Sequence, residues 1–583
     1  MMDGFHPSDL GDRLTSSRLS RRRFLRYTAV AGIGVPAASA LLAACGGGSD
    51  KTPTSASSAS TSSSGGAATT PTSVITIDQN ASPVAGSATP SATTASAGKA
   101  GGSITFTRSV DSLNADPTMW HNPDIWVFLS IYQQLVGVKE NGLELIPSLA
   151  EKWDVSQDGL TYTFAVRQGV KFSDGTDMTV DDIKWSLDRA KADEKGGWNF
   201  TLMQVKDIAA TDDKTLTITM TGVWAPFLSD ISMFNSAIIS KAFVDKNGVD
   251  YLAEHAMGTG PFFLKEWKKG VNITLGKNTS YWEKDRPFLD EVVLKQVPDT
   301  NSQILQLQGG ESLGIIGQND VPLNRVPDLE KDAKLKVYKF ASTYNNFVVL
   351  NCRNAPLNDV KLRQALNYAT DKDALIKTLL FGNAEVSNSF MPNGMLFWNP
   401  DQKPYDFDLD MANKLMGESQ SPDGAKIEML VNSGNEQQMQ IATALKSMWS
   451  KIKVDISIQQ MDAAVARDNY NHNQFVTNLS GWTNDIIDPD ELVSYAILPE
   501  SNENYHTGWT DQKAIDLAHQ AQTTLDPDER RQLYYQIQQI HKDAAPFVYL
   551  YVIPYVDVLS TKVKDFFHHP MGQYVFTNTY LES

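Results

Sequence analysis

A sharp change of composition near residue 103 is the feature that most constrains the fold. Residues 46–102 consist almost entirely of Ser, Thr, Ala, Gly and Pro. Such a segment has too few large apolar side chains to bury a core, so it predicts a disordered tether. From about Ser103 onward the composition is that of a folded chain, 41% of the whole sequence being hydrophobic. All packed domains are therefore expected within residues 103–583, and the length of the whole chain, 583 residues, allows roughly three or four domains.

A charged and then mildly apolar segment precedes the tether. The order Ser-Arg-Arg-x-Phe-Leu, which contains Arg21 and Arg22, resembles the twin-arginine export signal. Residues 28–44 are too short and too rich in Ala and Gly for a transmembrane helix, which needs ~20 strongly apolar residues. They suit the apolar part of a signal peptide.

The apolar run ends at Cys45 after two alanines, and this end resembles a bacterial lipobox, in which the cysteine is lipidated. The sequence therefore predicts a signal peptide over residues 1–44, lipidation of Cys45 and a tether over residues 45–102. The chain is expected to be exported and held at the outer face of the bacterial cytoplasmic membrane, or to be periplasmic.

Charge and cysteine content exclude two classes of protein. The net charge is −17, and Lys and Arg do not gather into a basic face, so nucleic acid is not an expected partner. The two cysteines, Cys45 and Cys352, lie far apart in different contexts. No disulfide framework is expected from them.

Residues 103–583 alternate between strand and helix patterns. Residues 161–166 alternate with period two after an Asp-Gly turn, which predicts a hairpin. Thr179 with Asp182 predicts a capped helix start, and Asp359 and Asp526 precede two further helical patterns. Another helix is expected over residues 124–135. Hairpins mixed with helices after strands predict an α/β fold with mixed sheets.

Residues 481–490 carry the strongest candidate for a binding site. They follow a predicted strand over residues 476–479 and place Trp482, Thr483 and Asp485 on a loop. An aromatic face packs against an organic group, and a partly desolvated carboxylate binds a cation. A core tryptophan beside a solvated aspartate is the alternative interpretation of the same residues.

Five stretches, in order along the chain, resemble the extracellular solute-binding proteins of peptide-type ABC importers. The match spans essentially all of residues 103–583. The stretches are residues 149–176, residues 258–262 with 278–282, residues 350–366, residues 481–490, and residues 528–546.

The resemblance implies a two-lobed, periplasmic-binding-protein-like α/β fold of the large peptide-binder type. Lobe I is expected over residues 103–342 and 541–583, with an extra subdomain, and lobe II over residues 343–540. The lobes are expected to cross near residues 340–345 and near residue 540. A ligand cleft is expected between them.

The resemblance also implies roles for individual residues. In peptide binders of this family, the aspartate at the position of Asp485 binds the ammonium group of the ligand. Trp482 and Thr483 are expected beside it, and the aromatic residues Trp398 and Tyr344 are candidates for the cleft wall. One departure is clear: residues 430–435 lack the arginine with which dipeptide binders hold the ligand carboxylate.

The predicted function is therefore solute capture for an ABC permease, with a peptide as the first candidate ligand. The missing arginine keeps a longer peptide, an oligosaccharide, an opine-like compound or a metal chelate open. The expected partners are that ligand, the permease and the membrane, and the chain is expected to be a monomer without a cofactor.

Two other classes of function have little support in the sequence. A surface hydrolase would need a nucleophile beside a base, and no such arrangement is visible in the sequence. An adhesive surface lipoprotein would show no ligand-dependent stability.

No metal site is predicted from the sequence. The group Asp485, Asp488, Asp490 and Glu491 lacks the ligand spacing of a calcium loop. His568 and His569 have no metal-ligand spacing and predict a solvated loop.

Overall fold

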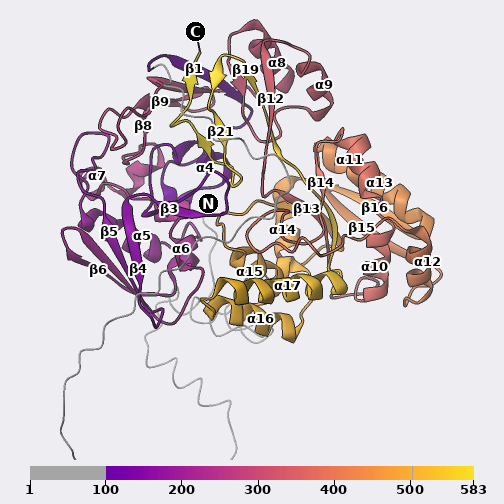
Figure 1. The fold of residues 1–583 in the computed structure, drawn as a ribbon. Helices are drawn as coiled ribbons and strands as arrows, with labels where there is room; N and C mark the ends of the chain where they lie inside the picture. Colours follow the sequence, from indigo (N-terminus) through magenta and orange to yellow (C-terminus); the bar gives the residue numbers. More distant parts are fainter. Residues whose placement is uncertain (1–99, 502, 583) are drawn as a thin grey trace, which may run out of the picture. The chain divides into compact units, whose positions relative to one another are not determined.

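The computed structural model describes residues 100–501 and 503–582, and Figure 1 shows their arrangement. The predicted signal peptide, including Arg21 and Arg22, and the predicted tether from Cys45 to residue 99 lie outside these residues. Within the described residues, no helix is both long and apolar enough to cross a membrane. Cys352 is a free thiol.

A seven-stranded mixed sheet is built around the first strand of the folded part. β1 (Ser103–Arg108) pairs in parallel with β10 and β11, and later segments add antiparallel strands on both sides. The sheet order is β12-β19-β11-β1-β10-β9-β8. Its other members are β8 (Phe262–Lys268), β9 (Asn272–Lys277), β10 (Glu291–Gln296), β11 (Gly314–Ile315), β12 (Leu335–Phe340) and β19 (Tyr555–Ser560).

A four-stranded antiparallel sheet inserts between β1 and β8. The predicted hairpin is confirmed, because β4 (Ala150–Val155) pairs antiparallel with β5 (Thr161–Val166). The predicted capping box is also confirmed: Thr179 caps α5 (Val180–Ala192), and Asp182 returns a hydrogen bond to the cap. The sheet is completed by β7 (Thr215–Met220) and β6 (Val205–Asp212).

A six-stranded mixed sheet forms the second large core, in the order β14-β18-β13-β17-β15-β16. Along β13 (Asn345–Leu350), Val348 and Leu350 pack into one hydrophobic core, whereas Phe347 and Val349 pack into another. This alternation shows that helices cover both faces of the sheet. The other strands are β14 (Glu385–Val386), β15 (Ala425–Asn432), β16 (Val454–Met461), β17 (Thr477–Trp482) and β18 (Phe547–Val552).

The first face of this sheet packs against α10–α13, and the second packs against α15–α17, drawn in gold in Figure 1. Asp359 and Asp526 accept hydrogen bonds at the starts of α10 and α17, as predicted. The helices are α10 (Val360–Tyr368), α11 (Lys372–Leu379), α12 (Leu409–Gly417), α13 (Glu436–Trp449), α15 (Asp490–Ile497), α16 (Gln512–Thr523) and α17 (Pro527–Ala544).

The chain passes between the two large sheets twice. β12 belongs to the seven-stranded sheet and β13 to the six-stranded one, so the first passage lies at residues 341–344. The second passage lies between Val552 and Tyr555, where β18 gives way to β19, whereas the prediction placed it near residue 540. The lobe boundaries stay a prediction, and the change of sheet marks where the chain crosses.

The prediction of a helix over residues 124–135 was largely wrong. α4 (Asn122–Phe128) begins with Asn-Pro and ends at Phe128. Leu135 instead lies beside the short strand β2 (Val136–Val138), and it packs in the core of the four-stranded sheet. Tertiary packing of apolar side chains therefore overrode the helical period.

Candidate functional site

The candidate loop leaves the six-stranded sheet at the end of β17. This strand lies between β13 and β15, and its last residue, Trp482, is paired with Asn345. The loop then runs over residues 483–489 to α15. The sequence placed Trp482 on the loop, but the structure places it at the last position of the strand, where the sheet holds it.

The first crossing segment fixes the position of this loop. The Thr343 hydroxyl accepts a hydrogen bond from the Asn484 backbone N–H at 3.0 Å, and the Thr343 N–H donates to the Pro570 carbonyl at 3.0 Å. Tyr344 covers the strand beside it, because a Cβ on Gly481 would lie 2.7 Å from Tyr344 Cε2. The loop is therefore held next to the C-terminal segment around Pro570.

Asp485 lines a cavity of about 60 Å³. The opposite walls come from segments far away in the sequence, among them Gln134, Ser232 and Phe234 before the first crossing and His569 and Gln573 after the second. Asp485 is partly exposed, whereas Ile486 and Ile487 beside it are buried. Of the predicted group of one carboxylate and two flanking isoleucines, only the carboxylate therefore lies at the cavity.

The cavity provides no positive charge for Asp485. Burial, and then the neighbouring Glu491 carboxylate, raise the pKa of Asp485 well above its usual range. His569 is the other titratable residue in the lining, and burial lowers its pKa to about 4, so it is neutral at pH 7. Among the described residues, Asp485 has no ion-pair partner.

Glu491, in the first turn of α15, holds the loop in position through hydrogen bonds to its carboxylate. Its Oε2 accepts hydrogen bonds from the backbone N–H groups of Asp485 at 2.9 Å and Ile486 at 3.3 Å. Its Oε1 accepts one from Trp482 Nε1 at 3.1 Å. From the sequence, Glu491 was predicted only as a member of the acidic group. Its position in the first turn of a helix that follows Asp485 was the signal available for this role.

Asp488, three residues after Asp485, has a different environment. Arg530 donates to both carboxylate oxygens of Asp488, from Nη1 to Oδ2 at 2.7 Å and from Nη2 to Oδ1 at 2.9 Å. Both residues are buried, at 4% and 6% exposure. Asp488 is therefore already neutralised by a side chain of α17.

The other predicted site residues lie at different places. Thr483 and Tyr344 are partly buried at the end of β17. Trp482 packs edge-to-face against Tyr495, with ring centroids 5.2 Å apart. Trp398 donates its indole N–H to Asn388 Oδ1 at 2.8 Å. Only Asp485 of the predicted ligand contacts lines the cavity.

The prediction of a solvated loop at His568 and His569 was wrong. His568 is buried in β21 (Phe567–His568), and its Nδ1 lies 2.8 Å from Asp557 Oδ2. His569 is buried as well, and its Nε2 lies 3.0 Å from the Lys139 carbonyl oxygen. The short strand pair made with β22 (Tyr574–Val575) buries both rings, which the local sequence could not indicate.

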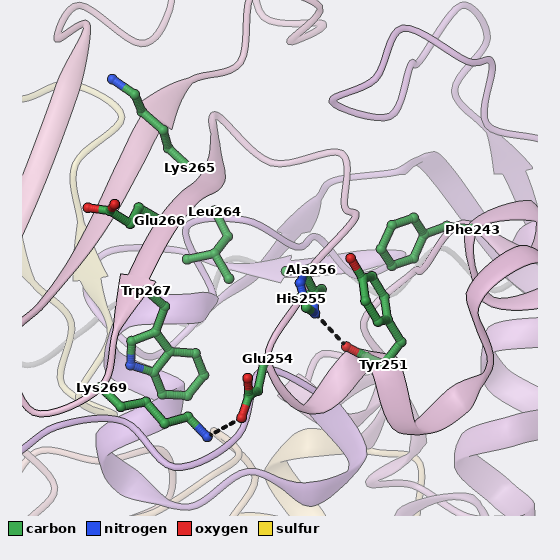
Figure 2. Close-up of a pocket in the computed structure, with 10 residues that line it drawn as sticks. All are labelled: Phe243, Tyr251, Glu254, His255, Ala256, Leu264, Lys265, Glu266, Trp267 and Lys269. Carbon is green, nitrogen blue, oxygen red and sulfur yellow. Dashed lines mark hydrogen bonds and ion pairs between the residues drawn. The ribbon is translucent and has the colours of Figure 1, made fainter.

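A larger hollow of about 330 Å³ lies elsewhere, beside β8 (Figure 2). Its lining includes Tyr251, His255 and Trp267, and none of the predicted site residues. The Tyr251 and His255 rings stack with centroids 3.6 Å apart, and Lys269 Nζ lies 2.7 Å from Glu254 Oε1. Because these charges already neutralise each other, the cavity at Asp485 is the better candidate for binding a charged ligand.

Comparison with known families identifies the fold. The middle part of family 5 of the bacterial extracellular solute-binding proteins matches residues 144–504, which is more than half of the chain. The chain belongs to this family. The matched region includes the Asp485 loop and Glu491, and the predicted function of solute capture for an ABC importer is confirmed at the level of the family.

Two curated relatives illustrate the similarity within the family. The chain is 28% identical over 481 residues to the dipeptide-binding protein of Escherichia coli K12, with 78% of this chain and 89% of the relative covered. It is also 28% identical over 465 residues to the glutathione-binding protein GsiB of Salmonella typhimurium, with 78% and 89% covered.

Solved structures confirm the two-lobed α/β fold class. The periplasmic binding protein DppA of Helicobacter pylori, associated with an ABC transporter and in complex with the peptide STSA, aligns with a TM-score of 0.72 at 30% identity. The alignment covers 83% of this chain and 99% of DppA. The binding protein AgaA of A. tumefaciens R10, in complex with agropinic acid, gives 0.70 at 25% identity, with 83% and 99% covered.

Proposed function

We propose that this family 5 member captures a small peptide by its N-terminal ammonium group, which binds Asp485, and delivers the peptide to an ABC permease. One observation carries the proposal. Asp485 lines a cavity, and among the described residues no basic side chain pairs with it. The peptide complex of the Helicobacter pylori relative supports the same ligand class.

Electrostatics favours a cationic ligand at this carboxylate. An ionised carboxylate removed from water is unfavourable unless a cation or several donors compensate it. The raised pKa of Asp485 reflects this unfavourable free energy of the ionised carboxylate. A ligand ammonium group would provide the missing charge together with up to three N–H donors.

The other end of the ligand lacks the anchor that dipeptide binders use. Residues 430–435 contain no arginine, and they form the end of β15 and the start of α13, with Asn435 as the N-cap. A peptide longer than two residues, held by backbone hydrogen bonds, fits this departure better than a dipeptide. An opine-like ligand is the second candidate, because the AgaA relative is in complex with agropinic acid.

We further propose that the chain is exported by its Arg21–Arg22 signal and anchored through lipidated Cys45, and that it acts as a monomer. The tether would give the folded part tens of ångströms of reach from the membrane. We propose a binding protein and not an enzyme, because the matched relatives are solute-binding proteins. Membrane fractionation of a Cys45→Ser variant tests the anchor, and an unchanged membrane-bound fraction would contradict it.

Calorimetry with two versions of one peptide tests the proposed ligand contact. The tetrapeptide Ser-Thr-Ser-Ala should bind, whereas its N-acetylated form, which has no ammonium group, should bind at least about 30-fold more weakly. Equal affinity for the two forms would overturn the role of Asp485. Native mass spectrometry of the purified protein should identify any solute that it retains.

A further inference from the structure

A second carboxyl group lies against the candidate cation site. Glu491 is only 3% exposed, and its two oxygens accept three N–H hydrogen bonds, from Trp482, Asp485 and Ile486. Such bonds stabilise a charged carboxylate. Asp485 belongs to the same loop, and its own N–H binds Glu491, so a partly exposed acidic group at the cavity lies next to a buried one.

The groups that face this pair are neutral. Three tyrosine side chains approach the pair: Tyr495 from α15, Tyr505 from the segment Glu503–His506 and Tyr555 from β19. Burial raises the pKa of each phenol. Across the cavity, His569 is neutral because burial lowers its pKa. On α17, the buried cation Arg530 is already bound to Asp488.

Two adjacent carboxylates without a cation cannot both remain ionised in a buried site at neutral pH. Burial raises the pKa of Glu491 to about 7, and burial together with the charge of Glu491 raises the pKa of Asp485 well above its usual range. A pair of this kind titrates as a unit. Below about pH 7 the unliganded pair therefore tends toward its fully protonated, neutral form, which has no charge to offer a cation.

We propose that Glu491 is the second acidic member of the ligand site and that the Asp485–Glu491 pair exchanges a proton for the ammonium group of the ligand. This inference rests on the proposed function. In the exchange, the ammonium group keeps its own protons and replaces a proton of the pair, which leaves to solvent, so the charge of the site is conserved. Glu491 is a positioning residue that acts through Asp485.

Proton exchange has a direct consequence for affinity. When binding releases one proton, the affinity falls by about tenfold for each pH unit below the pKa of the pair. Capture is then favoured at neutral and higher pH, and release is favoured in acid. If Glu491 only shaped the loop, its replacement would weaken binding by the same factor at every pH.

Infrared titration of the unliganded protein tests the pair without any ligand. The wild-type protein should lose protonated-carboxyl absorption between about pH 6 and 8, partly from Asp490, whose pKa burial also raises to about 7. The Glu491→Gln and Asp485→Asn variants should keep the Asp490 contribution, whereas the contribution of the pair should be smaller because one of its two carboxyl groups is gone. Trp482→Phe provides a matched variant, in which the pH of the carboxyl transition should change in the opposite direction. It removes one donor to the Glu491 carboxylate and should therefore move the transition to higher pH. Identical titrations in all four proteins would overturn the proposal.

Calorimetry with Ser-Thr-Ser-Ala, in two buffers of different ionisation enthalpy, tests the exchange itself. At pH 6 the wild-type protein should release about one proton per peptide. Glu491→Gln should move the midpoint of the affinity profile at least about one unit lower, because it removes the neighbouring charge that raises the pKa of Asp485. A reduced affinity with an unmoved midpoint would contradict proton exchange. Absence of peptide binding would overturn the proposed function alone, since the infrared result does not depend on a ligand.

Discussion

Asp485 and Asp488 lie three residues apart on one loop, yet their environments are opposite. Asp488 binds both terminal nitrogens of Arg530, and its backbone N–H donates to the Ser229 hydroxyl at 3.0 Å. Asp485 borders a cavity and a second carboxyl group, without a cation among the described residues. The difference separates structure from function: where the chain supplies the counter-charge, the aspartate stabilises the fold, and where it does not, a ligand can supply it.

Replacement of Arg530 should produce the largest effect on stability. Arg530→Met keeps most of the side-chain volume but leaves Asp488 buried without its cation, which should lower the free energy of unfolding by about 3–5 kcal/mol. Urea unfolding followed by circular dichroism measures this change. The matched control is Arg531→Met, because Arg531 pairs with Asp528, whose side chain is 83% exposed. The control should change stability by less than about 1 kcal/mol, and equal effects of the two variants would contradict the assignment.

Replacement of Asp485 should weaken ligand binding and leave the stability of the fold nearly unchanged. Asp485→Ala should abolish detectable peptide binding, and Asp485→Asn should weaken it by about 2–5 kcal/mol, because the ligand ammonium loses its counter-charge. The melting temperature should stay the same or rise, since a destabilised buried carboxyl group is removed. Calorimetry and thermal melting measure the two quantities. Unchanged affinity, or a large loss of stability, would place Asp485 in the same structural class as Asp488.

The pH dependence of stability should report the buried acids. Burial and the nearby charge of Asp488 raise the pKa of Asp490 to about 7. The folded protein then binds more protons than the unfolded chain between about pH 4 and 7, so this group makes stability fall as pH rises through that window. Asp490→Asn should flatten the slope of unfolding free energy against pH, by an amount on the order of a few kcal/mol over the window. A slope that is identical in wild type and variant would show that Asp490 titrates normally.

The contact between Asp488 and Ser229 should have the smallest effect. Ser229→Ala removes the hydroxyl that accepts from the buried Asp488 N–H, and this should lower the free energy of unfolding by about 1 kcal/mol. The change should be independent of the Asp485→Asn substitution, because the two sites share no hydrogen bond. Urea unfolding of both single variants and the double variant checks additivity, and a strong coupling would contradict the separation of the two regions.

Local chemistry accounts for the parts of the fold that could be predicted. The hairpin of β4 and β5 depends on an Asp-Gly turn between alternating strands, and the starts of α5, α10 and α17 depend on capping side chains. These signals act over about four residues, so the sequence carries them completely. The helix expected over residues 124–135 failed because apolar spacing alone does not show which core a side chain enters.

The family, the capped helices and the position of Asp485 on a loop after a buried strand could all be predicted from the sequence. The surroundings of that carboxylate could not be predicted, because they form only when distant segments pack together. His569 lies 84 residues after Asp485 in the sequence, and it is buried and neutral. Arg530 forms an ion pair with Asp488, whereas the Asp485 N–H donates a hydrogen bond to Glu491. The physical reason is that the charge of a buried group depends on partners within a few ångströms, and those partners come from distant segments that meet only on folding.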